Sequence, residues 1–395
     1  MKTLIPALAA LVLSVGALPA TQAALPQYRI ESFAAPPEGV FYRPSLLNNA
    51  GQVAGYLDDH GTGAEEAFLY SGGTVQRLGT LGGANSQAMG LNQRGEVTGY
   101  AFGADGIPRA FVYRNGRMSE VLRPPGAAVL SSGLDINEAG QVLGYSQPAD
   151  GIGLPFLSDG RTSRFLDVSG LGASAEGIEA RVLNDRGDVL GYFGVGDGSG
   201  DIHPFLYRDG RATALPMPPD LPPPSFLTRV YAVDLNNAGQ ALVNVVETID
   251  LPGDNNDFFS YLYSGGTITR LGDDEFEFLG GHINEKGWVV GSVRTYTEEP
   301  VSAIALYRDG EYGMLADLVP DEQAAQWALQ GALAMNDRGQ ILGQGTLLET
   351  GEFAYFIATP VPEPATALLA LAGLAVLGAA RRRHAAQAAR GNLAA

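Results

Sequence analysis

A ten-residue phrase, LNNAGQVAGY at residues 47–56, recurs along most of the chain and limits the folds that the chain can adopt. Seven copies are present, and their anchoring asparagines are 44 to 52 residues apart. These residues are Asn48, Asn92, Asn137, Asn184, Asn236, Asn284 and Asn336. Repeats of this period indicate one supersecondary unit that is stacked many times.

Each copy of the phrase predicts a hairpin turn and its outgoing strand. The asparagine side chain can hydrogen-bond backbone two residues on, and the glycine three residues later can take the positive φ of a tight reversal. A second phrase, such as AFLYSGGTVQRL from residue 67, centres on Gly-Gly, Asn-Gly or Asp-Gly between apolar strands, a strong hairpin signal. Each repeat therefore predicts two hairpins and four antiparallel strands, which is the composition of a propeller blade.

The seventh repeat lacks one strand. Its third strand, FAYFIATP at residues 353–360, is followed by a proline-rich segment with no fourth strand. At the other end, YRIESF at residues 28–33 is a strand without a hairpin partner. If this strand becomes the outer strand of the seventh blade, the ring closes and the unpaired edge of that blade disappears. We therefore predict an all-β fold, a seven-bladed β-propeller over residues 25–360 with 3+1 closure by the N-terminal strand.

The two ends of the chain predict its cellular localisation. Residues 1–24 have a positive start at Lys2, an apolar core and a small-residue cleavage pattern, as export signals do. After residue 360 come Val361, Pro362, Glu363 and Pro364, sixteen uncharged residues at 365–380, and Arg381, Arg382 and Arg383. The uncharged stretch predicts a transmembrane helix about 24 Å long with the arginines on the cytoplasmic side. Residues 384–395 form a C-terminal tail.

The segment 361–383 resembles the PEP-CTERM sorting signal of exported bacterial proteins, although here a twelve-residue tail follows the arginines. The resemblance implies an exosortase as partner and transit through the inner membrane. Delivery to the cell surface or polysaccharide matrix of a Gram-negative bacterium would follow. The repeats are similar to HAF-type extracellular repeats, as LGTLGG at residues 78–83 illustrates, but the His-Ala-Phe triplet itself is absent.

Composition argues against several kinds of chemistry. The chain has no cysteine and four histidines without metal-ligand spacing, and it has no Gly-x-Ser-x-Gly or phosphate-binding Gly-rich motif. We therefore expect no catalytic residues and no disulfide. The formal net charge of −18 disfavours nucleic acid and anionic membrane surfaces as partners.

Two acidic loops are candidates for calcium. In a four-stranded meander the Asn-x-x-Gly and Asp-Gly turns share one end, here called the turn face. The second-to-third loops and the connections between repeats share the other end, here called the loop face. Two loop-face segments have the oxygen-rich character of calcium sites, through Asp197, Asp201, Asp250, Asp254 and Asp257. Neither matches an EF-hand, and simple solvated loops are the alternative; we expect no other cofactor.

Three functions fit these observations. The leading hypothesis is a non-enzymatic, monomeric surface or matrix protein whose loop face binds a glycan, with or without calcium. The alternative is a carbohydrate-active enzyme that uses paired carboxylates of the same face. The third is a spacer without a ligand, which predicts no pocket and no cluster of aromatic side chains on the loop face.

Overall fold

The computed structural model describes residues 25–33, 39–148, 153–172, 175–196, 198–219, 221, 227–248, 257–272, 276–295 and 302–361. Almost all regular structure in these ranges is β-strand. The remaining elements are short: η1 (Ser169–Leu171), η2 (Leu315–Leu318) and α1 (Asp321–Ala324). The all-β prediction is confirmed.

The strands form consecutive four-stranded antiparallel sheets, one for each repeat. The first comprises β2 (Val40–Leu47), β3 (Val53–Asp59), β4 (Ala64–Ser71) and β5 (Thr74–Arg77). The second comprises β6 (Gly82–Leu91), β7 (Val97–Gly103), β8 (Pro108–Arg114) and β9 (Arg117–Glu120). The third comprises β10 (Ala127–Ile136), β11 (Val142–Pro148), β12 (Leu154–Ser158) and β13 (Ser163–Phe165).

The later sheets repeat this order. The fourth comprises β14 (Ala175–Leu183), β15 (Val189–Val195), β16 (Ile202–Arg208) and β17 (Arg211–Ala214). The fifth comprises β18 (Leu227–Leu235), β19 (Ala241–Thr248), β20 (Asp257–Ser264) and β21 (Thr267–Leu271), and one parallel bridge, Ile202 to Arg229, joins it to the fourth. The sixth comprises β22 (Phe276–Ile283), β23 (Val289–Thr295), β24 (Ser302–Arg308) and β25 (Glu311–Met314).

The seventh sheet is built from both ends of the repeat region. It comprises β26 (Trp327–Met335), β27 (Ile341–Leu347), β28 (Phe353–Val361) and β1 (Gln27–Ser32), in the order β1-β28-β27-β26. The antiparallel register runs from Gln27 opposite Val361 to Ser32 opposite Phe356. The predicted pairing of the N-terminal strand with the last repeat is thus observed.

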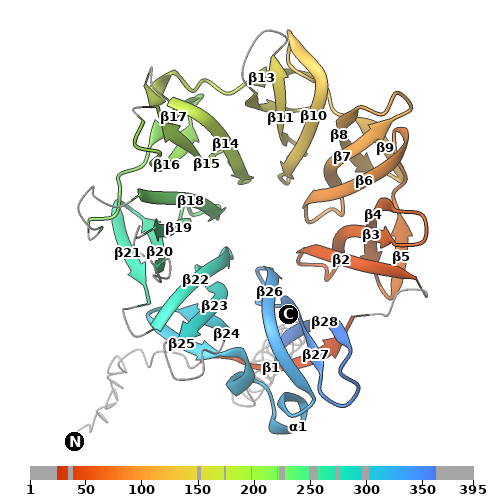
Figure 1. Ribbon diagram of the computed structural model, residues 1–395, viewed down its shortest axis with the longest axis vertical. Coiled ribbons are helices and arrows are strands. Elements are labelled where there is room, and N and C mark those ends of the chain that lie inside the picture. Colours follow the sequence, from red (N-terminus) through yellow and green to blue (C-terminus); the bar gives the residue numbers. More distant parts are fainter. Residues whose placement is uncertain are drawn as a thin grey trace, which may run out of the picture.

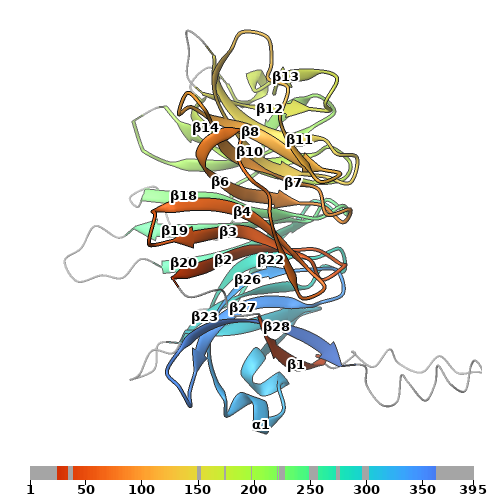
Figure 2. The same cartoon turned by 90° about the vertical axis from the view of Figure 1, so that its right-hand side faces the viewer.

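The sheets stand around a central axis in chain order (Figure 1), and the first strand of each repeat lies nearest that axis. In the side view the sheets lie one against the next through their broad faces (Figure 2). Every inner strand also carries a register shift just before its anchoring asparagine, for example between Pro44 and Leu46. A bulge of this kind re-aims the extra side chain.

The repeated glycine that precedes Tyr56 and its equivalents has a packing reason. Phenylalanines of the third strands are fully buried between sheets, including Phe156 and Phe205. A Cβ added at Gly144 would lie 2.3 Å from the Phe156 ring. The glycine therefore leaves room for an aromatic side chain whose burial stabilises the fold by about 1.5–3 kcal/mol.

The outer edge of β1 is covered by one side chain. The Ile30 N–H donates to Gln323 Oε1 at 3.0 Å, and Gln323 Nε2 donates to the Ile30 carbonyl at 3.4 Å. The Gln323 amide thus pairs with a strand edge as another strand would. Such cover is one way in which sheets avoid adding a further strand.

No helix within the described residues is long and apolar enough to cross a membrane. The predicted export signal (1–24), transmembrane helix (365–380) and C-terminal tail (384–395) lie outside the described residues.

Candidate functional site

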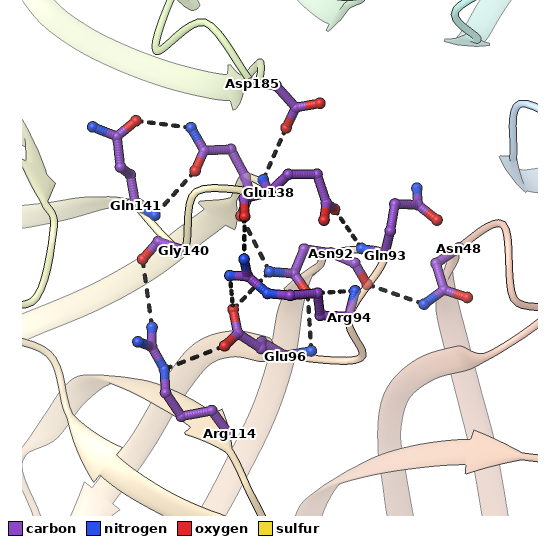
Figure 3. Close-up of polar contacts among 11 residues, drawn as sticks. Asn48, Asn92, Gln93, Arg94, Glu96, Arg114, Glu138, Gly140, Gln141 and Asp185 are labelled. Atoms are coloured by element: carbon purple, nitrogen blue, oxygen red, sulfur yellow. Dashed lines mark hydrogen bonds and ion pairs between the residues drawn. The ribbon is translucent and has the colours of Figure 1, made fainter.

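The seven anchoring asparagines form a closed circle of hydrogen bonds on the turn face. Each side-chain Nδ2 donates to the backbone carbonyl of the asparagine in the next repeat, at 2.9–3.3 Å. The last of these bonds returns from Asn336 to Asn48. Each Oδ1 meanwhile accepts backbone N–H groups of its own turn; for Asn92 the donors are Arg94 and Glu96 (Figure 3). The asparagines therefore shape their turns and also join neighbouring sheets.

A second circle runs beside the first, and sequence reasoning missed it. The residue after each asparagine accepts a hydrogen bond from the backbone N–H of its counterpart in the preceding repeat. The acceptors are Asn49, Gln93, Glu138, Asp185, Asn237, Glu285 and Asp337. All seven are Asn, Gln, Asp or Glu, because the position needs a side-chain carbonyl or carboxylate oxygen. The recurrence of these four residue types after each anchoring asparagine is visible in the sequence and could have indicated a hydrogen bond at this position of every repeat.

These turns surround an acidic opening on the axis, with a volume of about 210 Å³. Its carboxylates are Asp135, Glu138, Asp185, Asp234, Glu285 and Asp337. Burial raises the pKa of Asp135 to about 7, although the backbone N–H groups of Leu183 and Ile136 counteract this, and Asp234 and Asp185 raise it further. Burial, followed by nearby Asp337, also raises the pKa of Glu285.

The carboxylates of the opening are occupied by the protein itself. Asp135 accepts the N–H of Leu183 in the next repeat at 2.8 Å, and Asp234 accepts that of Ile283 at 2.9 Å. Within the described ranges, no three His, Cys, Asp or Glu side chains gather in a way that could hold a metal ion. The carboxylates of the opening therefore connect neighbouring sheets.

A different cavity, here called the seam pocket, lies between the first and seventh sheets, where the ring closes. Its volume is about 260 Å³. It is lined by Ser32, Phe33, Phe41, Tyr42, Arg43, Leu347, Glu352, Phe353, Ala354 and Tyr355. Because β2 and β28 both begin here, the pocket belongs to the loop face.

Aromatic rings dominate the seam pocket. Phe41 and Phe353 are 46% and 53% exposed, high values for phenylalanine. Phe353 packs edge-on against Tyr355 at 5.3 Å between ring centroids, and Phe41 lies 4.4 Å from the His60 ring. Exposed aromatic groups in a hollow, rimmed by polar side chains, mark binding sites.

Hydrogen-bonding groups surround these rings. Arg43 lies beside Tyr355, and its Nη2 is 3.5 Å from Asp58 Oδ2, which His60 Nε2 also approaches at 3.2 Å. Burial raises the pKa of Tyr355, although Arg43 opposes this effect, so the hydroxyl stays protonated at neutral pH. The pocket thus offers a guanidinium and a hydroxyl as donors and the Glu352 carboxylate as an acceptor.

The predicted calcium residues are not brought together by the described part of the chain. Asp197, Asp250 and Asp254 lie outside it, and for Asp257 only the backbone, in β20, is described. Asp201 directly precedes β16, and its backbone N–H donates a hydrogen bond to Ser199 Oγ at 3.1 Å. Calcium binding at these residues stays a prediction.

The described structure ends where the predicted sorting signal begins. Val361 closes β28, and Pro362, Glu363, Pro364 and the arginines 381–383 lie outside the described residues. Residues 360–383 match the PEP-CTERM protein-sorting motif. The PEP-CTERM motif marks an exported protein that is sorted through the exosortase pathway of Gram-negative bacteria. Its first two residues are therefore part of a strand, opposite Tyr28 and Gln27.

Comparison with other proteins adds little on function. No curated protein matches the chain. Among solved structures, a puromycin-hydrolyzing peptidase of Mycobacterium tuberculosis is similar with 14% identity over 85% of this chain and 56% of the peptidase (TM-score 0.48). The chain thus spans about half the length of that peptidase.

Two shorter proteins are also similar. An ulvan lyase of polysaccharide lyase family PL25 shares 11% identity over 73% of this chain and 86% of its own (TM-score 0.38). The fucose-specific lectin from Aleuria aurantia shares 12% over 67% and 89% (TM-score 0.32). Structural similarity at these sequence identities and TM-scores determines neither the family nor the activity of this chain.

Proposed function

We propose that this protein is a non-enzymatic glycan-binding protein of the bacterial surface or extracellular matrix. In this proposal it is a monomer, and the ring of sheets is a seven-bladed β-propeller built from HAF-type repeats. The PEP-CTERM motif supports export. The seam pocket, with two half-exposed phenylalanines beside donors and acceptors, is the observation that carries the glycan-binding proposal.

The propeller assignment is supported by continuity around the axis. The asparagine circle returns to its first member, and β1 completes the last sheet. A ring of sheets that closes in this way leaves only short, protected strand edges. The export signal at 1–24 and the membrane helix at 365–380 complete the proposed route to the surface.

The chemistry of the pocket fits a sugar. A pyranose ring has an apolar face that can lie against Phe41 or Phe353, and a rim of hydroxyl groups that need both donors and acceptors. Arg43 and Tyr355 donate, and Glu352 accepts. Mostly apolar walls with a few polar groups are typical of small-molecule sites.

The same residues favour binding over hydrolysis. Glycoside hydrolysis uses two carboxyl groups on either side of the scissile bond. Glu352 is the carboxylate among the lining residues, and nearby Asp58 interacts with Arg43 and His60. An enzyme of this class would need a second acid that is free to face the substrate.

The test is retention of the purified full chain on the producing organism's own exopolysaccharide, with calcium and then with a chelator, alongside a reducing-end assay. We expect retention without new reducing ends, and a loss of at least tenfold for Phe353→Ala, about 1.4 kcal/mol. Leu130→Ala, which removes a 47% exposed side chain from the third sheet, is the matched control and should retain binding.

Other results would point elsewhere. New reducing ends would identify a carbohydrate-active enzyme. No retention in either buffer would favour the hypothesis that the protein is a spacer without a ligand. Equal losses for Phe353→Ala and Leu130→Ala would place the glycan outside the seam pocket.

A further inference from the structure

A second pocket lies between the third and fourth sheets, along the middle of their strands. Its volume is about 340 Å³, and its walls are Ser132, Leu134, Tyr145, Glu179, Ala180 and Arg181. These residues come from β10, β11 and β14. We call it the second pocket.

The second pocket lies at the same kind of junction between neighbouring sheets as the seam pocket, but its lining comes from the first and second strands of the preceding sheet and not from the third. Arg43 in one and Glu179 in the other each stand five residues before an anchoring asparagine, near the middle of an inner strand. The register pairs Arg43 with Tyr56 and Glu179 with Tyr192. In both pockets the preceding sheet also supplies a tyrosine, although from different strands: Tyr355 comes from β28 and Tyr145 from β11.

The polar groups of the second pocket are available to a ligand. Arg181 is the bulged residue of β14, between Ala180 and Val182, and is exposed. Among the described residues its guanidinium has no hydrogen bond or ion pair. Glu179 Oε2 accepts a hydrogen bond from the Tyr192 hydroxyl at 2.5 Å, which leaves Oε1 as a further acceptor.

The charges of both pockets favour an uncharged sugar. Each pocket has one arginine and one glutamate in its lining, so its local charge is balanced. A polyanionic glycan would meet a protein with a formal net charge of −18. Hydroxyl groups, in contrast, pair equally well with a guanidinium and a carboxylate.

The two pockets are far apart around the axis. Sheets one to three lie between them on one side and sheets four to seven on the other (Figure 1). A short oligosaccharide would therefore fill one pocket, whereas a polymer or two polymers would engage both. Two sites on one rigid body give avidity and cross-linking.

We infer that the second pocket is a second glycan site, so that each molecule binds two segments of a neutral polysaccharide and cross-links the matrix. This inference rests on the proposed function of the seam pocket. It adds the number of sites, the ligand class and a role for the ring as a rigid spacer between the sites.

The experiment counts sites. Oligosaccharides of four to six sugars from the organism's exopolysaccharide are separated by anion exchange into neutral and acidic pools. Each pool is titrated by calorimetry into the full chain, the seam-pocket variant Phe353→Ala, the second-pocket variant Tyr145→Ala/Arg181→Gln, and their combination. We expect two sites for the neutral pool in the wild type, one in each variant and none in the combination.

A functional readout accompanies the titration. Light scattering of the intact polysaccharide should rise with the wild type and stay near baseline with either one-site variant. Arg164→Gln, at an exposed arginine of β13 outside the pocket, is the control and should behave as the wild type. Unchanged thermal melting of each variant shows that the fold is intact.

The outcomes separate the two proposals. One site in the wild type, lost in Phe353→Ala and unaffected by Tyr145→Ala/Arg181→Gln, overturns the second site and leaves the proposed function standing. Tighter binding of the acidic pool overturns the ligand class. No binding of either pool overturns the proposed function itself.

Discussion

Replacing Asn336 by alanine tests ring closure directly. Its Nδ2 donates to the Asn48 carbonyl at 2.9 Å and to Gln340 Oε1 at 2.9 Å, and its Oδ1 accepts the N–H groups of Arg338 and Gln340. Asn92, in an interior repeat, makes four corresponding contacts, with the Glu96 carboxylate in place of the Gln340 amide. The two asparagines are 4% and 2% exposed, so they are matched in burial.

The expected cost follows from these bonds. At about 1 kcal/mol for each of four hydrogen bonds, alanine at either position should lower the free energy of unfolding by about 4 kcal/mol. For about 340 folded residues the unfolding entropy is about 0.7 kcal/mol/K, so the melting temperature should fall by about 6 °C.

The assay is differential scanning calorimetry of wild type, Asn92→Ala and Asn336→Ala under one set of conditions. Ring closure predicts equal shifts, because Asn336 has a partner across the seam just as Asn92 has one in the next repeat. A shift for Asn336→Ala of about three quarters of that for Asn92→Ala, or less, would show that the bond to Asn48 is absent, because only three of the four hydrogen bonds would then be lost. Shifts near zero for both would refute the structural role of the circle.

Three further predictions concern stability. Gln323→Ala should cost about 1–2 kcal/mol and speed proteolysis within β1, because the strand edge loses both contacts at Ile30; equal proteolysis rates would contradict this. Since the pKa of Asp135 is raised to about 7 in the fold from 3.8, the folded state binds the extra proton, so stability should fall as pH rises from about 4 to 7. Asp135→Ala should flatten that slope in melting curves, and an unchanged slope would assign it to other groups. Arg208→Ala should cost about 1 kcal/mol at neutral pH, measured by urea unfolding, because buried Asp188 loses its 2.8 Å partner while Arg186 stays nearby. Although burial opposes the shift, these partners lower the pKa of Asp188, so the cost should shrink only as pH falls well below 4, and a cost of unchanged size down to about pH 2 would rule out the ion pair.

The elements of the fold were readable because their signals are local. Asn-x-x-Gly fixes a turn within five residues, and paired positive-φ residues such as Asn115 and Gly116 fix the other hairpin. The missing fourth strand of the last repeat pointed to residues 28–33 as its partner. In each case a short stretch of chain sets its own backbone geometry.

The sequence predicted only part of the two hydrogen-bond circles on the turn face. The asparagines were assigned to turn geometry, which their Oδ1 contacts confirm, but their Nδ2 groups bind the neighbouring repeat. The amide and acid side chains that follow them carried a visible pattern whose meaning depends on the spacing between sheets. The acids of the central opening were likewise missed.

The sequence by itself determined the period, the turns and the address of this protein, because backbone preference and sorting motifs are written in contiguous residues. The tertiary structure alone decided the pockets. Phe41 and Phe353 line one pocket because β1 pairs with β28 and brings the two ends of the repeat region together. Contacts that form only where the two ends of the repeat region meet occur once in the chain and leave no periodic trace, whereas the asparagine contacts recur in every repeat.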